Sequence, residues 1–107
     1  MTMSEYIDAI GTEQIPEGDC AAVTIEGREI VVIHASDAFH AIDDECPHQG
    51  AALSDGAVDG GLIICPLHYW EFEYETGACL EEPDCPVARH ECKVENGRVL
   101  IKLADND

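Results

Sequence analysis

Four residues in the middle of the chain have the types and the spacing of a metal centre. Cys46 and His48 form one pair, Cys65 and His68 form the other, and sixteen residues separate the two pairs. Each pair offers one sulfur and one nitrogen ligand from a short loop. Thiolates favour zinc or iron–sulfur clusters, and imidazole suits both zinc and iron. The pattern therefore predicts a centre held by two sulfur and two nitrogen atoms.

The order of these ligands bears on the kind of metal. Zinc sites usually group Cys with Cys and His with His. Here the two types alternate, as a two-iron cluster with unlike ends requires. One iron would take Cys46 and Cys65, and the other would take His48 and His68. Zinc stays open as an alternative at this point, because ligand types alone do not exclude it.

The residues around the four ligands extend the pattern. They are Cys46-Pro47-His48-Gln49-Gly50, Leu53-Ser54-Asp55-Gly56, Tyr69-Trp70-Glu71-Phe72 and Thr76-Gly77. With this pattern the chain resembles the Rieske family over most of its length. The resemblance implies one [2Fe–2S] Rieske cluster on Cys46, His48, Cys65 and His68. It also implies an all-β fold, in which an antiparallel β-sandwich base carries an inserted cluster-binding subdomain.

Within this family the chain looks most like the soluble ferredoxin of bacterial multicomponent oxygenases. Two segments, Cys46–Gln49 and Pro83–Cys85, are similar to the toluene monooxygenase type. The resemblance implies an electron carrier and not an enzyme. Such a carrier takes electrons from an NAD(P)H-dependent flavin reductase and passes them singly to a terminal oxygenase. We expect it to be a monomer. No further catalytic constellation is visible in the sequence.

Two other functions fit parts of the pattern. The small subunit of assimilatory nitrite reductase has a similar length and a comparable run around its second loop. Some of those chains lack the cluster ligands, whereas this chain has all four, which favours the carrier. A zinc-binding interaction domain is a third and weaker alternative.

The resemblance also bears on the reduction potential of the cluster. High-potential members of the family carry a second Cys in each loop, and the two are joined by a disulfide. Ala51 and Leu67 stand at those places here. The hydroxyl donor that follows the second His in those members is also missing, since Tyr69 and Trp70 occupy that region. We therefore expect a potential near or below about −100 mV, at the low end of the Rieske range.

Charge and hydropathy exclude other classes. Five basic and twenty-three acidic residues give a net charge of −18, so a nucleic-acid partner is not expected. From residue 43 to 84 there are eleven acidic residues and no Lys or Arg. Acidic surroundings could steer basic partners, or they could serve solubility or a salty cytoplasm. The sequence shows no signal peptide and no apolar run of about 18 residues, so we expect a cytoplasmic protein without a membrane span.

Periodicity predicts one domain, residues 1–107, built mainly of hairpins. We expect a base from residues 1–42 and 87–107 and a cluster-binding subdomain from residues 43–86. The predicted strands are Tyr6-Ile7, Ala21–Ile25, Glu29–His34, Phe39–Ile42, Leu62–Ile64, Trp70–Glu75, Arg89–Glu95 and Arg98–Leu103, with a possible helical turn at Ala51–Ser54. Asn96-Gly97 predicts a type I′ hairpin turn.

The remaining Cys and His residues have plainer interpretations. Cys20, Cys79, Cys85 and Cys92 are expected to be buried free thiols and not structural bridges. His34, His40 and His90 lie on predicted strands, where we expect ordinary surface or half-buried side chains. Trp70, Phe72 and Tyr74 alternate with glutamates, which predicts one buried aromatic face.

Overall fold

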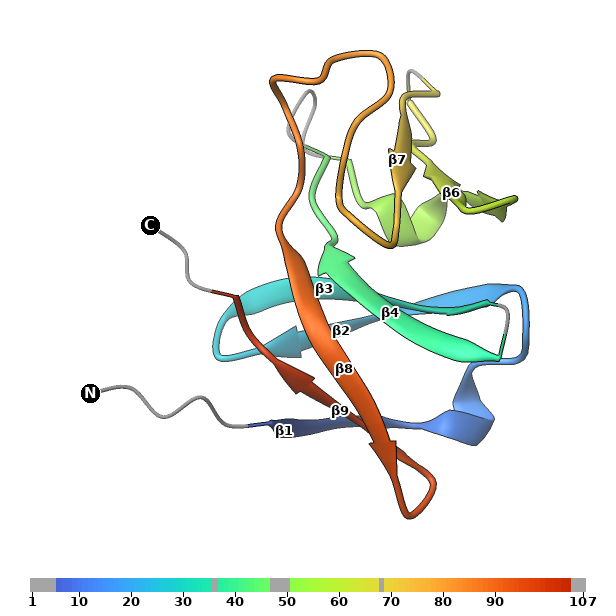
Figure 1. The fold of residues 1–107 in the computed structure, drawn as a ribbon, viewed down its shortest axis with the longest axis vertical. Helices are drawn as coiled ribbons and strands as arrows, with labels where there is room; N and C mark the ends of the chain where they lie inside the picture. The colour runs from blue at the N-terminus through green and yellow to red at the C-terminus, as the bar shows by residue number, and fades with distance from the viewer. Residues whose placement is uncertain (1–5, 36, 47–50, 68, 105–107) are drawn as a thin grey trace.

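The computed structural model describes residues 6–35, 37–46, 51–67 and 69–104. Its strands are β1 (Ile7–Gly11), β2 (Asp19–Ile25), β3 (Arg28–Ala35), β4 (Ala38–Asp43), β5 (Ala57–Asp59), β6 (Leu62–Ile64), β7 (Glu71–Glu73), β8 (Arg89–Glu95) and β9 (Arg98–Lys102). Two short 3-10 helices, η1 (Thr12–Gln14) and η2 (Leu53–Asp55), complete the elements (Figure 1). The all-β class predicted from the sequence is confirmed. Within the described residues, no helix is long and apolar enough to span a membrane.

The strands form two antiparallel sheets. A six-stranded sheet has the order β1-β9-β8-β4-β3-β2, and a three-stranded sheet has the order β5-β6-β7. β1 and β2, at the two edges of the larger sheet, contact each other, so this sheet curls round on itself. The smaller sheet and its flanking loops (residues 44–46, 51–67 and 69–88) stand above the larger sheet in Figure 1 and are called the upper unit below.

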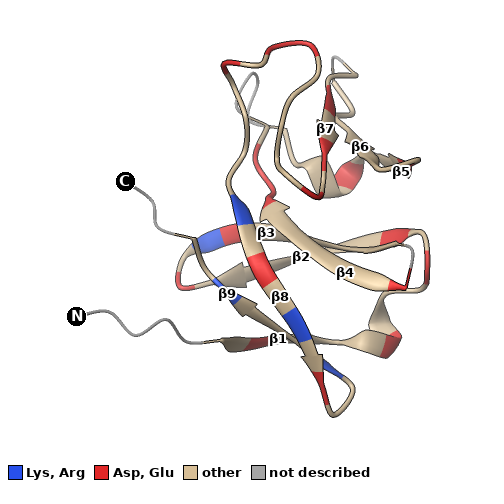
Figure 2. Cartoon of the chain, in the orientation of Figure 1, with Lys and Arg blue, Asp and Glu red and all other residues tan. Residues whose placement is uncertain are grey.

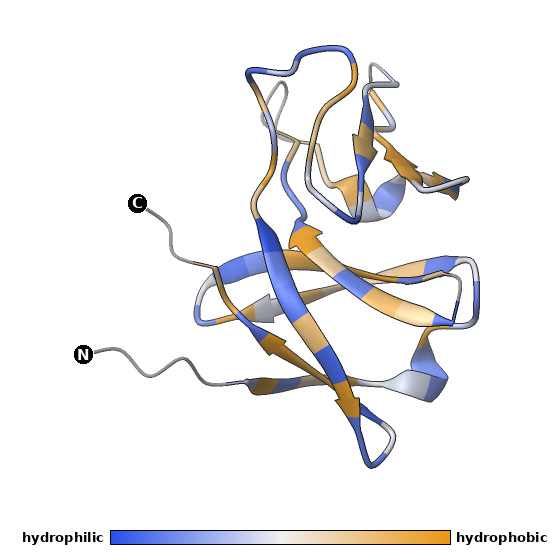
Figure 3. Cartoon of the chain, viewed as in Figure 1, coloured by the Kyte–Doolittle hydropathy of each residue, from blue (hydrophilic) through white to orange (hydrophobic). Residues whose placement is uncertain are grey.

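Strand β3 lies between two apolar cores. Ile30 and Val32 pack into the core enclosed by the larger sheet, together with Val99 and Ile101. Val31 and its alternate neighbours pack into a second core, which contains the buried residues of the upper unit. Successive side chains of a strand point to opposite faces, so both faces of β3 are buried. Burial of both faces explains the continuous apolar run of β3, which is coloured as hydrophobic in Figure 3. Because Val31 and Ile33 share a core with residues of the upper unit, β3 packs that unit against the base.

Turn chemistry explains where the hairpins reverse. β8 and β9 pair up to Glu95 opposite Arg98, and Asn96 and Gly97 between them have φ values of 54° and 76°. Two consecutive positive φ values define the type I′ turn that Asn-Gly favours, so this prediction is confirmed. The turn between β2 and β3 uses Glu26 and Gly27 in the same region, with φ values of 52° and 81°.

The structure corrects three sequence predictions in the upper unit. The strand expected over Trp70–Glu75 is shorter, because the N–H of Gly77 donates to the carbonyl of Glu73 at 2.7 Å and turns the chain. The helical turn lies at Leu53–Asp55 and is a single 3-10 turn. β5 was not predicted at all, since Val58 is the only large apolar residue in its three positions and its pairing with β6 supplies the order.

Candidate metal centre

The first candidate loop follows strand β4 and delivers Cys46. The side chain of Cys46 is buried, and its backbone N–H donates to the carbonyl of Ala51 at 2.8 Å. Glu45 and Ala52 form an isolated antiparallel bridge just outside this bond. These two contacts bring Glu45 and Cys46 next to Ala51 and Ala52. His48 lies outside the described residues.

Asp44 holds the two ends of this loop together. It is 2% exposed, and its carboxylate accepts a hydrogen bond from the backbone N–H of Ser54 at 2.7 Å and one from the Ser54 hydroxyl at 3.0 Å. The carbonyl of Asp44 also accepts the N–H of Leu53 at 2.6 Å. A buried carboxylate needs such donors to offset its lost hydration. No local pattern in the sequence distinguishes Asp44 from its acidic neighbours Asp43 and Glu45, so this role is visible only in the fold.

The second candidate loop follows β6 and delivers Cys65. This side chain is fully buried, and its N–H donates to the carbonyl of Trp70 at 2.8 Å, while the N–H of Tyr69 donates to the Cys65 carbonyl at 3.0 Å. These two bonds hold Cys65 close to Tyr69 and Trp70. Tyr69 has a φ of 60°, which is costly for a bulky residue. His68 lies outside the described residues.

Cys46 and Cys65 belong to one apolar core. Leu53, Ile63 and Phe72, all fully buried, are members of the same core. A thiolate in such surroundings needs a positive partner, and the sequence has no Lys or Arg from residue 43 to 84. Iron ions would supply that charge. The two described donors therefore fit the sulfur end of a two-iron cluster.

The charge distribution separates the upper unit from the base. Acidic residues occur on both, whereas the basic residues drawn in Figure 2 lie on strands of the larger sheet. Arg28 is on β3, Arg89 and Lys93 are on β8, and Arg98 and Lys102 are on β9. The acidic surroundings expected from the sequence thus belong to the same structural unit as the two buried Cys residues.

A second polar network lies below the upper unit, at the end of β4. His90 is 1% exposed, and its Nε2 lies 2.8 Å from Oδ1 of Asp43. The N–H of Ala104 donates to His90 Nδ1 at 2.9 Å, so the ring proton is on Nε2. Burial lowers the pKa of His90, and the nearby Asp43 carboxylate opposes that shift. His90 is thus fully buried, which corrects the expectation of a surface or half-buried histidine, whereas His34 and His40 are half-buried.

The four remaining cysteines are free thiols, and none is joined to another. Cys79 is buried in the core that holds Cys46 and Cys65, and its backbone forms an isolated antiparallel bridge with Phe72. Cys20, Cys85 and Cys92 are half-buried, less than the buried state expected from the sequence. Burial raises the pKa of Cys20 and of Cys92 to about 11 in each case, so both are protonated thiols at neutral pH.

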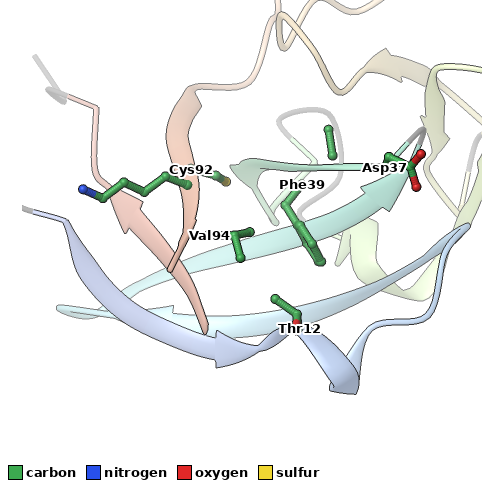
Figure 4. Close-up of a pocket in the computed structure, with 7 residues that line it drawn as sticks. Thr12, Asp37, Phe39, Cys92 and Val94 are labelled. Atoms are coloured by element: carbon green, nitrogen blue, oxygen red, sulfur yellow. The ribbon is translucent and has the colours of Figure 1, made fainter. Parts of the chain in front are cut away.

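A cavity of about 520 Å³ opens in the base and not in the upper unit (Figure 4). β4 pairs with β8 only at Ala41–His90 and Ile42–Arg89. If the pairing of β4 with β8 continued in this register, Phe39 would lie opposite Cys92. The two residues are not paired, and both line the cavity. The cavity is therefore explained by the divergence of two strands.

An all-β domain that buries Cys46 and Cys65 in one core fits the sulfur half of a mixed Cys and His cluster. Comparison with known proteins identifies the family. The family model described as "Rieske [2Fe-2S] domain" matches residues 5–97. The chain belongs to the Rieske [2Fe–2S] family, and the cofactor of that family is a single Rieske cluster.

Two curated relatives indicate the kind of Rieske protein. The chain is 38% identical to the ferredoxin component of the naphthalene 1,2-dioxygenase system of Pseudomonas aeruginosa, over 94% of this chain and 97% of the relative. It is 32% identical to the ferredoxin component of the alkene monooxygenase system of Xanthobacter autotrophicus, over 91% of this chain and 80% of the relative. The recognition of a Rieske ferredoxin is confirmed. The narrower likeness to the toluene monooxygenase type stays a prediction.

Solved structures agree on the fold. The ferredoxin in a complex of reduced oxygenase and oxidized ferredoxin of carbazole 1,9a-dioxygenase has a TM-score of 0.83 and 29% identity, covering 94% of each chain. A putative nitrite reductase small subunit from Mycobacterium tuberculosis has a TM-score of 0.87 at 21% identity, covering 98% of this chain and 100% of that one. The second likeness concerns the fold alone.

Proposed function

We propose that this chain is the ferredoxin component of an oxygenase system, an electron carrier and not an enzyme. The observation that carries this proposal is the placing of Cys46 and Cys65 in one buried core. The similarity to a ferredoxin component over 94% of this chain and 97% of that relative supports it. A Rieske cluster, when bound, takes up and releases one electron at a time.

The cluster ligands in this proposal are Cys46, His48, Cys65 and His68. The two Cys sulfurs would hold one iron, and the two imidazoles would hold the other. Burial of both Cys side chains supports their half of the assignment. The assignment of His48 and His68 is supported by the spacing of the sequence motif. We also propose that residues 43–86 act as the cluster-binding subdomain, on a base formed by residues 1–42 and 87–107.

The residues around the two loops have positioning roles. Asp44 and Ser54 tie the ends of the first loop, and the backbone bonds of Tyr69 and Trp70 tie the second. Leu53, Ile63 and Phe72 exclude water from the two thiols, since each of these side chains is fully buried. A dry, fixed site limits the rearrangement that accompanies electron transfer.

The proposed partners are an NAD(P)H-dependent flavin reductase, which donates electrons, and a terminal oxygenase, which accepts them. Ferredoxin components of oxygenase systems pair with a terminal oxygenase, as the carbazole 1,9a-dioxygenase complex exemplifies. The donor reductase, a monomeric state and a cytoplasmic location are parts of the proposal that follow from the family resemblance. Light scattering of the purified protein would test the monomer.

The first experiment is electron paramagnetic resonance of anaerobically purified protein, before and after dithionite. We expect a rhombic signal only after reduction, with an average g value below that of all-Cys clusters. His48→Ala and His68→Ala should each abolish that signal. His40→Ala, on β4 in the base, is the matched control and should leave it unchanged. A colourless protein with one bound zinc would contradict the proposal.

A further inference from the structure

Among the described residues, four large hydrophobic side chains are exposed, and three of them belong to the upper unit. Leu67, Tyr69 and Leu80 are 55%, 73% and 47% exposed. Leu67 and Tyr69 directly flank His68 in sequence. The N–H of Leu80 donates to the carbonyl of Glu71 at 2.9 Å, which holds Leu80 close to the segment that follows Tyr69. We call these three residues the tip patch. Exposed apolar residues that gather beside a functional site indicate an interaction surface.

The backbone holds Tyr69 in its exposed position at a cost. Its φ of 60° lies in the left-handed region, which disfavours bulky side chains. Its N–H is bonded to the Cys65 carbonyl at 3.0 Å, so the loop geometry imposes this conformation. Backbone strain of this kind concentrates at functional sites. The structure thus keeps a large aromatic side chain in solvent next to a proposed cluster ligand.

A pair of carboxylates borders the tip patch. The backbone N–H of Glu71 donates to Oε1 of Glu81 at 2.8 Å, which brings the two glutamates together. A hydrogen bond with the Glu81 side chain raises the pKa of Glu71, and partial desolvation and the Glu81 charge act in the same direction. Glu82 and Asp84 are exposed on the same return segment. Two like charges held this close are stabilised by any cation placed between them.

We propose that the tip patch and the Glu71–Glu81 pair form a docking surface for a redox-partner protein. Its complementary face would have an apolar centre bordered by Lys and Arg, one of which would bind between Glu71 and Glu81. The inference rests on the proposed function. It defines a surface on this chain and the chemistry of its partner, namely a basic protein and not a membrane or a nucleic acid.

Mitochondrial cytochrome c is a suitable probe, because it is a basic protein and a one-electron acceptor. The reduced ferredoxin would lose one electron, and the ferric haem would become ferrous. Two quantities are measured for each variant, the second-order rate constant as a function of ionic strength and the dissociation constant between the two oxidised proteins. The dissociation constant involves no electron transfer, so it measures only how tightly the two surfaces bind.

Matched variants on the base distinguish binding at this surface from a general effect of the protein's net charge or exposed apolar area. Glu71→Gln with Glu81→Gln removes two charges and keeps an oxygen that can accept the Glu71 N–H. Glu13→Gln with Glu26→Gln removes two exposed charges from the base and is the control. Leu80→Ser has Val94→Ser as its control, since Leu80 and Val94 are both 47% exposed. Tyr69→Asn removes the aromatic ring and keeps a residue type that tolerates a positive φ.

We expect the Glu71/Glu81 double variant to weaken binding and slow transfer about tenfold at low salt, with a flatter dependence on ionic strength. Leu80→Ser and Tyr69→Asn should weaken binding at all salt concentrations, and both controls should stay within about twofold. Equal losses in the test and control variants would overturn the docking surface. If the wild-type protein transfers no electron but its binding still depends on Glu71 and Glu81, the surface stands and the carrier function fails.

Discussion

The carboxylate of Asp44 accepts hydrogen bonds from both the backbone N–H and the hydroxyl of Ser54, at 2.7 and 3.0 Å. The two residues lie on either side of the loop that begins at Cys46. This contact joins the segment before Cys46 to the segment after Ala52, and the Asp44 side chain is buried. The position of Cys46 therefore depends on the side chain of Asp44, which is not one of the proposed ligands.

Ser54→Ala should lower the free energy of unfolding by about 1.5–3 kcal/mol, because a hydrogen bond to a buried charged group is lost. It should also speed the loss of visible absorbance when the protein is diluted into denaturant. Thr76→Ala is the control, since it removes only exposed hydrogen bonds near Glu73 and Ala78. An equal loss of unfolding free energy in the two variants would show that the Asp44–Ser54 contact stabilises the protein no more than an exposed hydrogen bond does.

His90 should make the stability depend on pH. Its pKa is lowered in the folded protein, mainly by burial, whereas an unfolded histidine titrates near about 6.5. As pH falls through that value the unfolded chain takes up a proton that the folded chain does not, so the free energy of unfolding decreases. The stabilising contribution is thus complete above about pH 6.5 and is lost on acidification.

Urea titrations of the wild-type protein and of His90→Gln between pH 7.5 and 5 would measure this effect. We expect the pH slope of the variant to be smaller by up to about one proton. His40→Gln is the comparison, because burial also lowers the pKa of the half-buried His40 and a smaller change is expected there. Identical slopes for the wild-type protein and His90→Gln would contradict the assignment.

Gly77 should tolerate no side chain. It has a φ of +86°, and a Cβ atom there would lie 2.1 Å from the carbonyl oxygen of Val87. The N–H of Val87 also donates to the Gly77 carbonyl at 2.8 Å, so the two backbones cannot separate without breaking this bond. Gly77→Ala should therefore cost more than about 3 kcal/mol in the free energy of unfolding.

Gly97→Ala is the control for Gly77→Ala. Gly97 has a similar φ of +76°, but nothing lies within 4 Å of its added Cβ. The expected cost is only the conformational penalty, about 1–2 kcal/mol. Thermal unfolding of the two variants, followed by circular dichroism, would separate steric from conformational strain. Equal melting temperatures would show that the Gly77–Val87 contact can relax.

The reduction potential should be near or below about −100 mV. The two loops offer no second Cys, with Ala51 and Leu67 at those positions. Tyr69 is 73% exposed, which is not the environment of a hydroxyl bonded to a buried cluster. Fewer hydrogen bonds to sulfur stabilise the added electron less. An anaerobic redox titration followed by electron paramagnetic resonance measures the potential, and a value above zero would contradict this prediction.

Local signals in the sequence predicted much of the base. The Asn96-Gly97 turn and the run from Ile30 to Ile33 are short-range patterns whose physical meaning does not depend on distant residues. The strand expected over Trp70–Glu75 was too long, because the turn at Gly77 ends the pairing at Glu73. β5 was missed because its three residues are ordered by β6 and not by their own propensity.

The sequence alone determined the family, the four proposed ligands and the all-β class, because ligand types at fixed spacing and alternating apolar residues are properties of neighbouring positions. Only the tertiary structure showed that Asp44 binds Ser54 across the first loop, that half-buried Asp43 pairs with buried His90, and that Leu80 bonds to Glu71 after the second loop. These contacts join residues that are 9 to 47 positions apart. Such distances are set by how the two sheets pack, and no local pattern encodes them.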